Sequence, residues 1–283
     1  MVKGNQSRIE TLALTEVHCS GSCSPAGCTD LGKSEGVTFK VDDAVQGPVP
    51  DCSLISALAS VAWVKQAYLN RYPVYQFKDP DTGVITPITL TSKNMLVDSS
   101  GNPVGAQVGI NGVVWPLLYE KAYAMWKNVP NWSTTTCPNV CQMPSIFGHK
   151  GLISVTRKNA PAPFTINASS QNDNTIANLL NGITDVSKKA LYPAVGWTLE
   201  RSAPGIIASH TYSYLGYYKS SSNVYYIVLR NPCRAEPSSN VLTSGKWPNT
   251  ATGPVDFANG SDGIFALNFR AITCNLNIGY VQI

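Results

Sequence analysis

The feature that most constrains this chain is a cysteine placed where a rigid turn meets a long apolar segment. The turn is Gln46-Gly47-Pro48-Val49-Pro50-Asp51, and Cys52 follows it directly. In residues 53–69 apolar side chains recur at helical spacing over a wide face, which predicts a buried helix. Asp51 is a favourable N-cap residue for that helix. The unpaired N–H groups and the positive dipole end of a helix N-terminus favour a thiolate, so Cys52 is a candidate nucleophile.

A buried, inert thiol is the alternative interpretation of Cys52, because free cysteine is among the residues most often found inside proteins. The rest of the chain distinguishes the two interpretations. A catalytic thiolate needs a base, a group that orients this base, and hydrogen-bond donors for an oxyanion.

Composition excludes some classes of function. Of the 283 residues, 43% are hydrophobic and 13% are charged, and the apolar residues are periodic, which indicates a folded chain with a sizeable core. The net charge is +4 without a long basic run, so we expect no nucleic-acid partner. No apolar stretch approaches the roughly 20 residues that span a bilayer, and residues 1–7 are polar. We therefore expect no membrane association and no signal peptide, and we expect a monomer.

The eight cysteines fall into close groups. They are Cys19, Cys23 and Cys28, then Cys137 and Cys141, with Cys52, Cys233 and Cys274 standing apart. Without Cys52 seven remain, so three disulfides and one free thiol is a consistent count. A metal site built from His18 and the first group is an alternative, although it lacks the usual paired spacing. The groups, with Asn-X-Ser sites at Asn131, Asn167 and Asn259, favour disulfides in a secreted, extracellular protein, with a cytoplasmic protein as the alternative.

The order of the expected elements predicts an α+β fold. Helices are expected at residues 53–69, 116–125 and 175–189, strands at 192–199, 210–218, 224–230 and from 263 onward, and a hairpin tip at 79–83. Because helices precede strands without βαβ alternation, we expect a helical lobe and a sheet lobe. The expected domains are a Cys-rich N-terminal extension (1–35), a helical lobe with Cys52 (36–145) and a β-rich lobe (146–283).

Hairpin geometry places one of the three histidines beside an amide. Pairing of the strands 210–218 and 224–230 that is symmetric about Ser220 and Ser221 sets His210 opposite Asn231. Cross-strand neighbours lie ~5 Å apart, within reach of a side-chain hydrogen bond. A bulge at Gly216 would shift this register by one residue.

Cys52, His210 and Asn231 would together provide a nucleophile, a base and an orienting amide. Gln46, six residues before the cysteine, adds a side-chain N–H that can converge with the Cys52 backbone N–H on an oxyanion. Singly, each residue has an ordinary structural explanation, since a histidine at a strand end often only packs and Asn-Pro commonly ends a strand. Their joint arrangement favours catalysis.

Five segments resemble the protease core of the calpain family, in family order over about residues 40–270. They are Gln46-Gly47-Pro48-Val49-Pro50-Asp51-Cys52 with the helix that follows, Trp115-Pro116-Leu117-Leu118-Tyr119-Glu120-Lys121-Ala122-Tyr123-Ala124, Ser209-His210-Thr211-Tyr212-Ser213, Leu229-Arg230-Asn231-Pro232 and Asp262-Gly263-Ile264-Phe265. The resemblance implies a papain-like, two-lobed cysteine peptidase that hydrolyses protein or peptide substrates through a thioester acyl-enzyme. In it Cys52 is the nucleophile, His210 the base, Asn231 the orienting residue and Gln46 the oxyanion donor.

Three residues depart from the family pattern near the expected site. Ser53 and Cys233 stand where the family has tryptophan, and Pro50 replaces glycine. The alternative function is therefore a calpain-like protein without turnover that binds other proteins through its cleft, and acyl transfer of the transglutaminase kind ranks third. The sequence requires no cofactor, but calpain cores bind calcium, so calcium is a candidate. Its candidate oxygen ligands are Asp79, Asp81, Glu236, Asp256 and Asp262.

Overall fold

The structure is a computed structural model of the chain. It describes residues 29–30, 38–91, 96–97, 103–108, 112–129, 143, 148–199, 201–247, 255–257, 260 and 262–283. The expected N-terminal extension lies almost wholly outside these residues. So do the two close groups of cysteines and the alternative metal site at His18.

Helices and strands both occur, and strands dominate the second half of the chain. The helices are η1 (Val41–Asp43), α1 (Cys52–Lys65), η2 (Gln66–Tyr68), α2 (Trp115–Trp126), α3 (Lys150–Thr156), α4 (Asp173–Asn181) and η4 (Phe269–Ala271). The strands are β1 (Thr29–Asp30), β2 (Val74–Lys78), β3 (Ile85–Thr89), β4 (Leu96–Val97), β5 (Phe164–Ile166), β6 (Lys189–Trp197), β7 (Thr211–Lys219), β8 (Tyr225–Arg230), β9 (Lys246–Trp247), β10 (Val255–Asp256), β11 (Ile264–Asn268) and β12 (Leu276–Tyr280).

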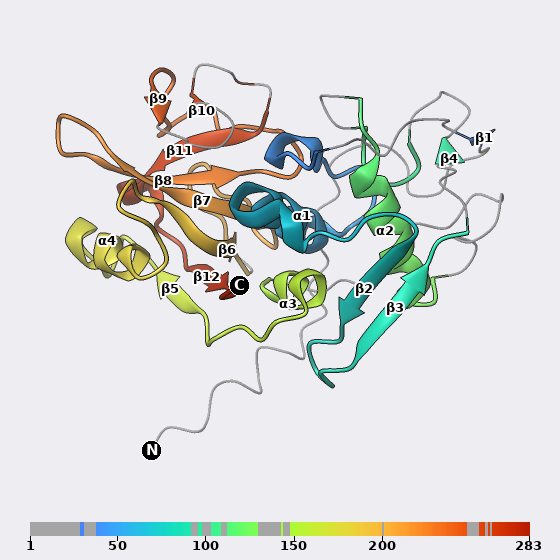
Figure 1. Cartoon of the computed structure of the whole chain (residues 1–283). Helices are drawn as coiled ribbons and strands as arrows, with labels where there is room; N and C mark the ends of the chain where they lie inside the picture. Colours follow the sequence, from blue (N-terminus) through green and yellow to red (C-terminus); the bar gives the residue numbers. More distant parts are fainter. Residues whose placement is uncertain are drawn as a thin grey trace.

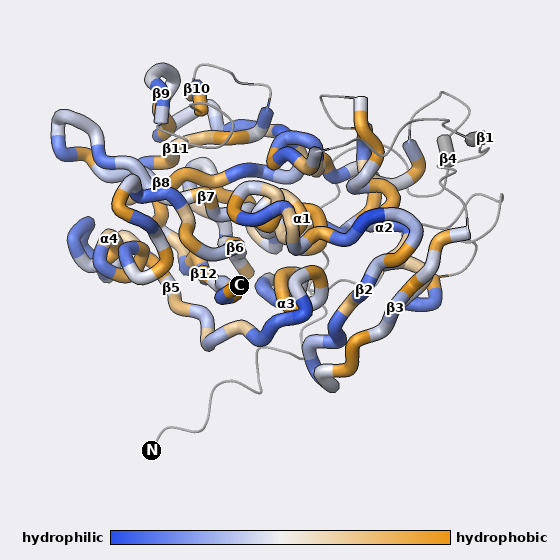
Figure 2. Tube along the Cα trace, viewed as in Figure 1, coloured by the Kyte–Doolittle hydropathy of each residue, from blue (hydrophilic) through white to orange (hydrophobic). Residues whose placement is uncertain are grey.

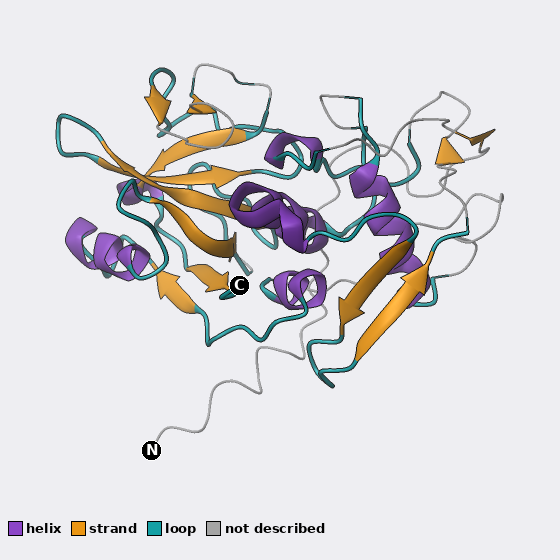
Figure 3. Ribbon diagram, in the orientation of Figure 1, coloured by secondary structure: helices purple, strands orange, loops and turns teal. Residues whose placement is uncertain are grey.

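An antiparallel sheet of six strands, in the order β11-β8-β7-β6-β12-β5, forms the centre of the described structure. α1 packs against β6 and β7, and α3 packs against α1 and β2 (Figure 1). α2 and the β2–β3 hairpin lie on the far side of α1 from α4 (Figure 3). The fold therefore combines helices with an antiparallel sheet, as expected, whereas the papain-like division into two lobes stays a prediction.

The buried helix expected after the turn is present as α1, and its contact with the sheet is partly polar. The Ser56 hydroxyl donates to the Thr211 carbonyl (2.9 Å), and the Ser213 hydroxyl donates to the Ser56 carbonyl (2.9 Å). The Ala194 N–H donates to the Ser60 hydroxyl (2.7 Å). Serine side chains thus satisfy buried polar groups where α1 meets β6 and β7.

Aromatic side chains join α2 to the β2–β3 hairpin. Phe77 on β2 stacks on Trp126 with ring centroids 5.2 Å apart, and Tyr75 meets Tyr119 edge-on at 4.9 Å. Such pairs contribute roughly 0.5–1.5 kcal/mol beyond the burial of their area. The predictions of a helix at α2 and of a hairpin tip at residues 79–83 are both confirmed.

The third predicted helix ends earlier than expected. α4 stops at Asn181, before Gly182, whereas the sequence predicts a helix that continues to residue 189. The Asp185 carboxylate accepts hydrogen bonds from the backbone N–H groups of Ser187 (2.8 Å) and Lys189 (3.0 Å), so a local turn replaces the last helical turns. Hydrophobic and hydrophilic residues alternate along α4, as in an amphipathic surface helix (Figure 2).

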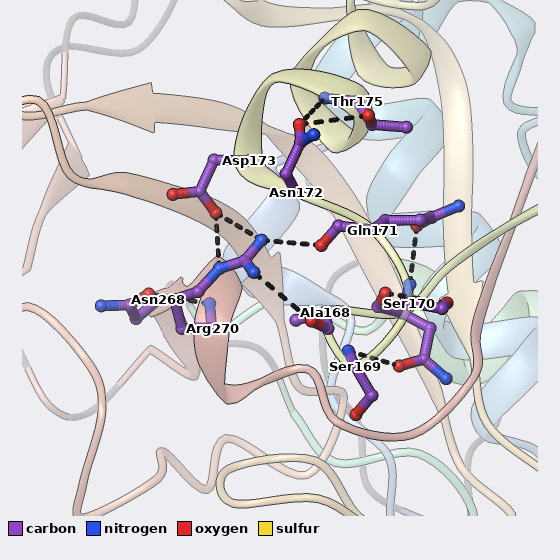
Figure 4. Close-up of polar contacts among 10 residues, drawn as sticks. Ala168, Ser169, Ser170, Gln171, Asn172, Asp173, Thr175, Asn268 and Arg270 are labelled. Carbon is purple, nitrogen blue, oxygen red and sulfur yellow. Dashed lines mark hydrogen bonds and ion pairs between the residues drawn. The ribbon is translucent and has the colours of Figure 1, made fainter.

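Arg270 on η4 holds the start of α4 against the connection between β11 and β12 (Figure 4). Its Nε donates to the Asp173 carboxylate (2.7 Å), and its Nη2 donates to the Gln171 carbonyl (3.0 Å). Asn172 caps the helix by accepting from the Thr175 N–H at 2.9 Å. This exposed network belongs to the side of the sheet that α4 covers.

The sequence pattern does not predict α3, which has only seven residues. α3 lies very close to α1, since a Cβ atom on Gly151 would come within 2.5 Å of the Ser53 carbonyl oxygen. A helix this short depends on tertiary packing, which hydrophobic periodicity does not reveal.

The predicted register of the β7–β8 hairpin is wrong. Lys219 pairs with Tyr225 across a turn at residues 220–224, so the hairpin is centred on Ser222 instead of between Ser220 and Ser221. An irregularity between residues 214 and 216, near the expected bulge, shifts the pairing back by one residue toward the expected register.

The corrected register changes how the histidine reaches the amide. Ser213 pairs with Arg230, and extending this pairing would place His210 opposite residue 233 instead of Asn231. The two side chains therefore meet diagonally across the end of the hairpin, an arrangement that long side chains can bridge.

Candidate functional site

Cys52 is the first residue of α1, and its buried thiol lies outside any disulfide. Asp51 occupies the N-cap position, but its side chain makes no cap hydrogen bond, contrary to the expectation from sequence. Its carbonyl oxygen accepts from the Leu54 N–H at 2.8 Å and begins the helix. The positive end of the helix dipole lies beside the sulfur and favours the thiolate form.

His210 directly precedes β7 and is bound to Asn231 through its ring. The distance between His210 Nε2 and Asn231 Oδ1 is 2.9 Å, and the Cys233 backbone N–H donates to the same oxygen at 3.0 Å. Because a backbone N–H needs an acceptor, the amide oxygen faces both groups, and Nε2 must carry the ring proton. This tautomer leaves a lone pair on Nδ1, which is buried and makes no hydrogen bond to the described residues.

The imidazole of His210 is neutral at pH 7. Burial lowers its pKa to about 4, while the hydrogen bond to Asn231 acts in the opposite direction and is the smaller influence. A neutral ring with a lone pair on Nδ1 is the form that can accept a proton from a thiol.

Neighbouring contacts bring Cys52 and His210 to one place. Ser53 and Thr211, the residues that follow them, have hydroxyl oxygens 2.9 Å apart. The His210 ring meets Tyr212 edge-on with centroids 4.8 Å apart. Burial raises the pKa of the Tyr212 phenol, and the nearby Cys52 raises it further. Both residues therefore lie beside Tyr212, where α1 meets the start of β7.

Gln46 lies in the same region. Its backbone N–H donates to the carbonyl of Pro232, the residue after Asn231, at 3.0 Å. Its side-chain Nε2 donates one hydrogen to the Val49 carbonyl at 2.7 Å, and an amide nitrogen carries two hydrogens. The turn before Cys52 is thereby attached to the chain that carries the amide partner of the histidine.

Cys233 lies between Asn231 and Gln46. Its sulfur is 3.8 Å from Gln46 Oε1. Cys233 is disulfide-bonded, so its sulfur has no proton to donate and this approach is a packing contact. Cys274 is a buried thiol outside any disulfide, and burial raises its pKa.

This arrangement provides the parts of a nucleophilic reaction at a carbonyl carbon. A thiol stands at a helix N-terminus, a neutral imidazole has a defined tautomer, and N–H groups of the preceding turn lie nearby. Such a set can form and break a covalent acyl intermediate.

A protein of known class resembles the chain over most of its length. A thiol protease from Porphyromonas gingivalis (strain ATCC BAA-308 / W83) is 29% identical over 272 residues, and the match covers 86% of this chain. The similarity supports a cysteine protease. The chain spans about half the length of this relative, 55%. No family model matches the chain.

Sequence reasoning missed an indole that lies near the expected cysteine protease site. The Gly148 N–H donates to the Ser53 hydroxyl at 3.0 Å, and a Cβ atom on Gly148 would lie 2.8 Å from the Trp197 ring. Gly148 therefore lies between Trp197 on β6 and Ser53, and Ser53 is the position where the calpain-family pattern has tryptophan. His149 is tilted against the same ring with centroids 5.2 Å apart. Only the packing of α3 on α1 reveals this neighbour.

Glu120 was also missed, although it forms part of a segment that resembles the family. It is 0% exposed in the middle of α2. The available signal was an acidic residue within a helix that is otherwise apolar and aromatic except for Lys121, because buried carboxyl groups are rare unless something binds them.

Proposed function

We propose that the protein is a calpain-like cysteine endopeptidase that hydrolyses peptide bonds through a thioester acyl-enzyme. Similarity to a thiol protease supports the reaction class. The observation that carries the assignment of residues is the 2.9 Å hydrogen bond between His210 and Asn231, because it gives the ring the tautomer that a base needs.

In this mechanism Cys52 Sγ attacks the carbonyl carbon of the peptide bond while its proton passes to His210 Nδ1. The oxyanion of the tetrahedral intermediate accepts hydrogen bonds from the Cys52 backbone N–H and the Gln46 side chain. The imidazolium then protonates the leaving amine, the C–N bond breaks, and the thioester remains. A water molecule that gives its proton to Nδ1 hydrolyses the thioester and restores the thiol. Asn231 holds the ring through Nε2.

The proposed turnover uses no metal, and calcium is kept as a candidate effector. The part of the chain that the structure describes contains no cluster of three or more His, Cys, Asp or Glu side chains suited to a metal ion. Two of the candidate acids are engaged by lysines, with Asp79 3.7 Å from Lys127 and Asp81 2.9 Å from Lys150. Comparing activity with calcium and with chelator tests calcium as an effector.

We also propose how the protein as a whole is organised. It has a helical lobe at residues 36–145 and a β-rich lobe at 146–283, a protein or peptide substrate between them, a monomeric state and an extracellular location. Within the described residues, no helix combines the length and apolar character that a bilayer crossing needs.

A binding protein without turnover is the second candidate function. The observation that favours it is burial, since Cys52 and His210 are each 0% exposed. A substrate reaches these residues only when the groups around them move aside. In that case Cys52 would only pack beneath a cleft that binds a partner protein.

Incubation with an unfolded protein substrate separates the two functions. Wild type and Cys274→Ala, the matched control for a buried thiol, are expected to produce fragments with calcium and with chelator, and Cys52→Ala to produce none. Cleavage by Cys52→Ala would assign the activity to another residue. Retention of the substrate by wild type without cleavage would favour the binding protein.

A further inference from the structure

Glu120 is a fully buried carboxyl group that the proposed triad does not use. Its Oε2 accepts from the Ala106 N–H at 2.6 Å, and its carboxyl group lies against that of Asp51, which lowers the pKa of Glu120. These two contacts belong to segments that are separate in sequence, and both segments adjoin the proposed oxyanion site.

The contact between Glu120 and Asp51 leads to the nucleophile. Asp51 directly precedes Cys52, whose backbone N–H is one of the two proposed donors to the oxyanion. The Asp51 side chain does not cap α1 and lies against the Glu120 carboxyl group. The position of the carboxyl group on α2 therefore determines how the turn enters the catalytic helix.

The contact between Glu120 and Ala106 leads to Gln46, the other proposed donor to the oxyanion. Ala106 follows Gly105, whose carbonyl oxygen lies so close to Gly47 that a Cβ atom there would overlap it. Gly47 follows Gln46, the proposed side-chain donor. The loop that Glu120 holds at Ala106 is thus packed against the backbone beside that donor.

We propose that Glu120 is a positioning residue for the oxyanion site. It holds Asp51 on one side and the Ala106 loop on the other, so that the N–H groups of Gln46 and Cys52 converge on one oxygen atom. This role rests on the proposed peptidase function, because only an acyl-transfer reaction needs the oxyanion site.

The two carboxyl groups share a proton, because two buried negative charges in contact would repel one another. Burial raises the pKa of Glu120 to about 7, while the Ala106 N–H and Asp51 lower it by smaller amounts. The titratable groups next to the pair along the chain are Cys52, which follows Asp51, Lys121, which follows Glu120, and Tyr123 one turn further along α2. Asp43 on η1 is joined to the start of α2.

The Asp43 carboxylate accepts from the Trp115 indole at the start of α2, at 3.0 Å. Above about pH 7 the proton of the pair is lost, and repulsion between Asp51 and Glu120 is expected to loosen the turn.

Glutamine at position 120 would mimic the protonated carboxyl group. Its oxygen accepts from the Ala106 N–H and its NH2 group donates to Asp51, and it cannot ionise. Alanine would break both contacts. Asp173→Asn is the control for loss of a carboxylate away from the site, because Asp173 lies at the start of α4 and is paired with Arg270.

The experiment measures two rates in wild type and these three variants from about pH 5.5 to about pH 8.5. Hydrolysis of a peptide substrate passes through an oxyanion. Alkylation of Cys52 by iodoacetamide forms a C–S bond and releases iodide without an oxyanion, so it reports the thiol alone.

Glu120→Ala is expected to lower kcat/KM about 10²-fold, as the loss of an oxyanion donor does, with the alkylation rate unchanged. Glu120→Gln is expected to match wild type below pH 7 and to lack the decline that wild type and Asp173→Asn show above it.

Equal losses in hydrolysis and alkylation in Glu120→Ala would show a general structural role and overturn the proposal. A Glu120→Gln variant with the decline of wild type would overturn it as well, and this profile decides if the alanine variant does not fold. Full hydrolysis by Glu120→Ala would disprove the positioning role and leave the proposed peptidase function standing. Absence of hydrolysis in wild type removes the proposed function and this role with it.

Discussion

The hydroxyl oxygens of Ser53 and Thr211 lie 2.9 Å apart, and each residue directly follows a proposed catalytic residue. The Ser53 hydroxyl also accepts from the Gly148 N–H at 3.0 Å. One small side chain therefore connects the helix of the nucleophile to the strand of the histidine and to the loop before α3. A tryptophan, which the calpain-family pattern has at this position, could not make these hydrogen bonds with its ring.

Replacing Ser53 by alanine should weaken this connection. The change leaves the buried Gly148 N–H and the Thr211 hydroxyl with one partner fewer, so we expect the free energy of unfolding to fall by about 1–3 kcal/mol. We also expect a lower kcat, because the thiol and imidazole lose alignment. Urea unfolding and steady-state kinetics measure both effects.

Ser170→Ala is the control for this prediction. The exposed Ser170 hydroxyl donates only to the Asn167 carbonyl at 3.3 Å, so its loss should change stability by less than about 0.5 kcal/mol. Equal losses in the two variants would deny Ser53 a special role.

His210 and Asn231 should differ in how much each contributes to turnover. His210→Ala removes the base and is expected to lower kcat/KM by about 10²–10⁴-fold. Asn231→Ala keeps the base but releases the ring, so a smaller loss is expected. Kinetics on a peptide substrate would contradict the assigned roles if Asn231→Ala lost more activity than His210→Ala.

Stability against pH should reveal two buried groups with opposite slopes. Burial lowers the pKa of His210 from 6.5 to about 4, so its stabilising contribution is present above pH 6.5 and is lost as the pH falls through 4. Burial raises the pKa of Glu120 from 4.5 to about 7, so its contribution is full below pH 4.5 and is lost as the pH rises through 7.

Single substitutions separate these slopes. Relative to wild type, the free energy of unfolding of His210→Gln should fall more steeply as the pH rises. The free energy of unfolding of Glu120→Gln, relative to wild type, should increase as the pH rises. Urea unfolding at a series of pH values measures both differences. A change of the other sign in either variant would show that burial is not the cause.

Arg270 tests whether activity depends only on the residues around the proposed site. Its contacts to Asp173 and to the Gln171 carbonyl fix the start of α4, and the ion pair is exposed to solvent. Arg270→Ala is expected to cost about 1 kcal/mol or less in stability and to leave kcat/KM unchanged. A large loss of activity would mean that α4 influences the site through the sheet.

The sequence was most informative where periodicity and local chemistry agree. α1, α2 and the central strands follow from apolar spacing, and the four proposed site residues follow from chain order and from resemblance. The His210–Asn231 contact was predicted although the register was not, because a diagonal pair reaches as well as a direct one.

The remainder depends on contacts between distant segments. α3 forms because Gly151 allows it to approach α1. The pairing of Asp51 with Glu120 joins residues of two helical segments that no local pattern connects. Each is a tertiary effect that overrides or escapes local propensity.

The central claim is that Cys52 is a nucleophile activated by His210. The most direct measurement is the rate of Cys52 alkylation by iodoacetamide against pH, located by peptide mass spectrometry in a Cys274→Ala background. We predict rapid alkylation already near about pH 5.5 in the parent, because the helix N-terminus stabilises the thiolate and the thiolate stabilises the imidazolium that takes its proton, and a shift toward the ordinary thiol range near about pH 8.5 in His210→Ala. Identical profiles with and without the His210 imidazole would contradict the claim.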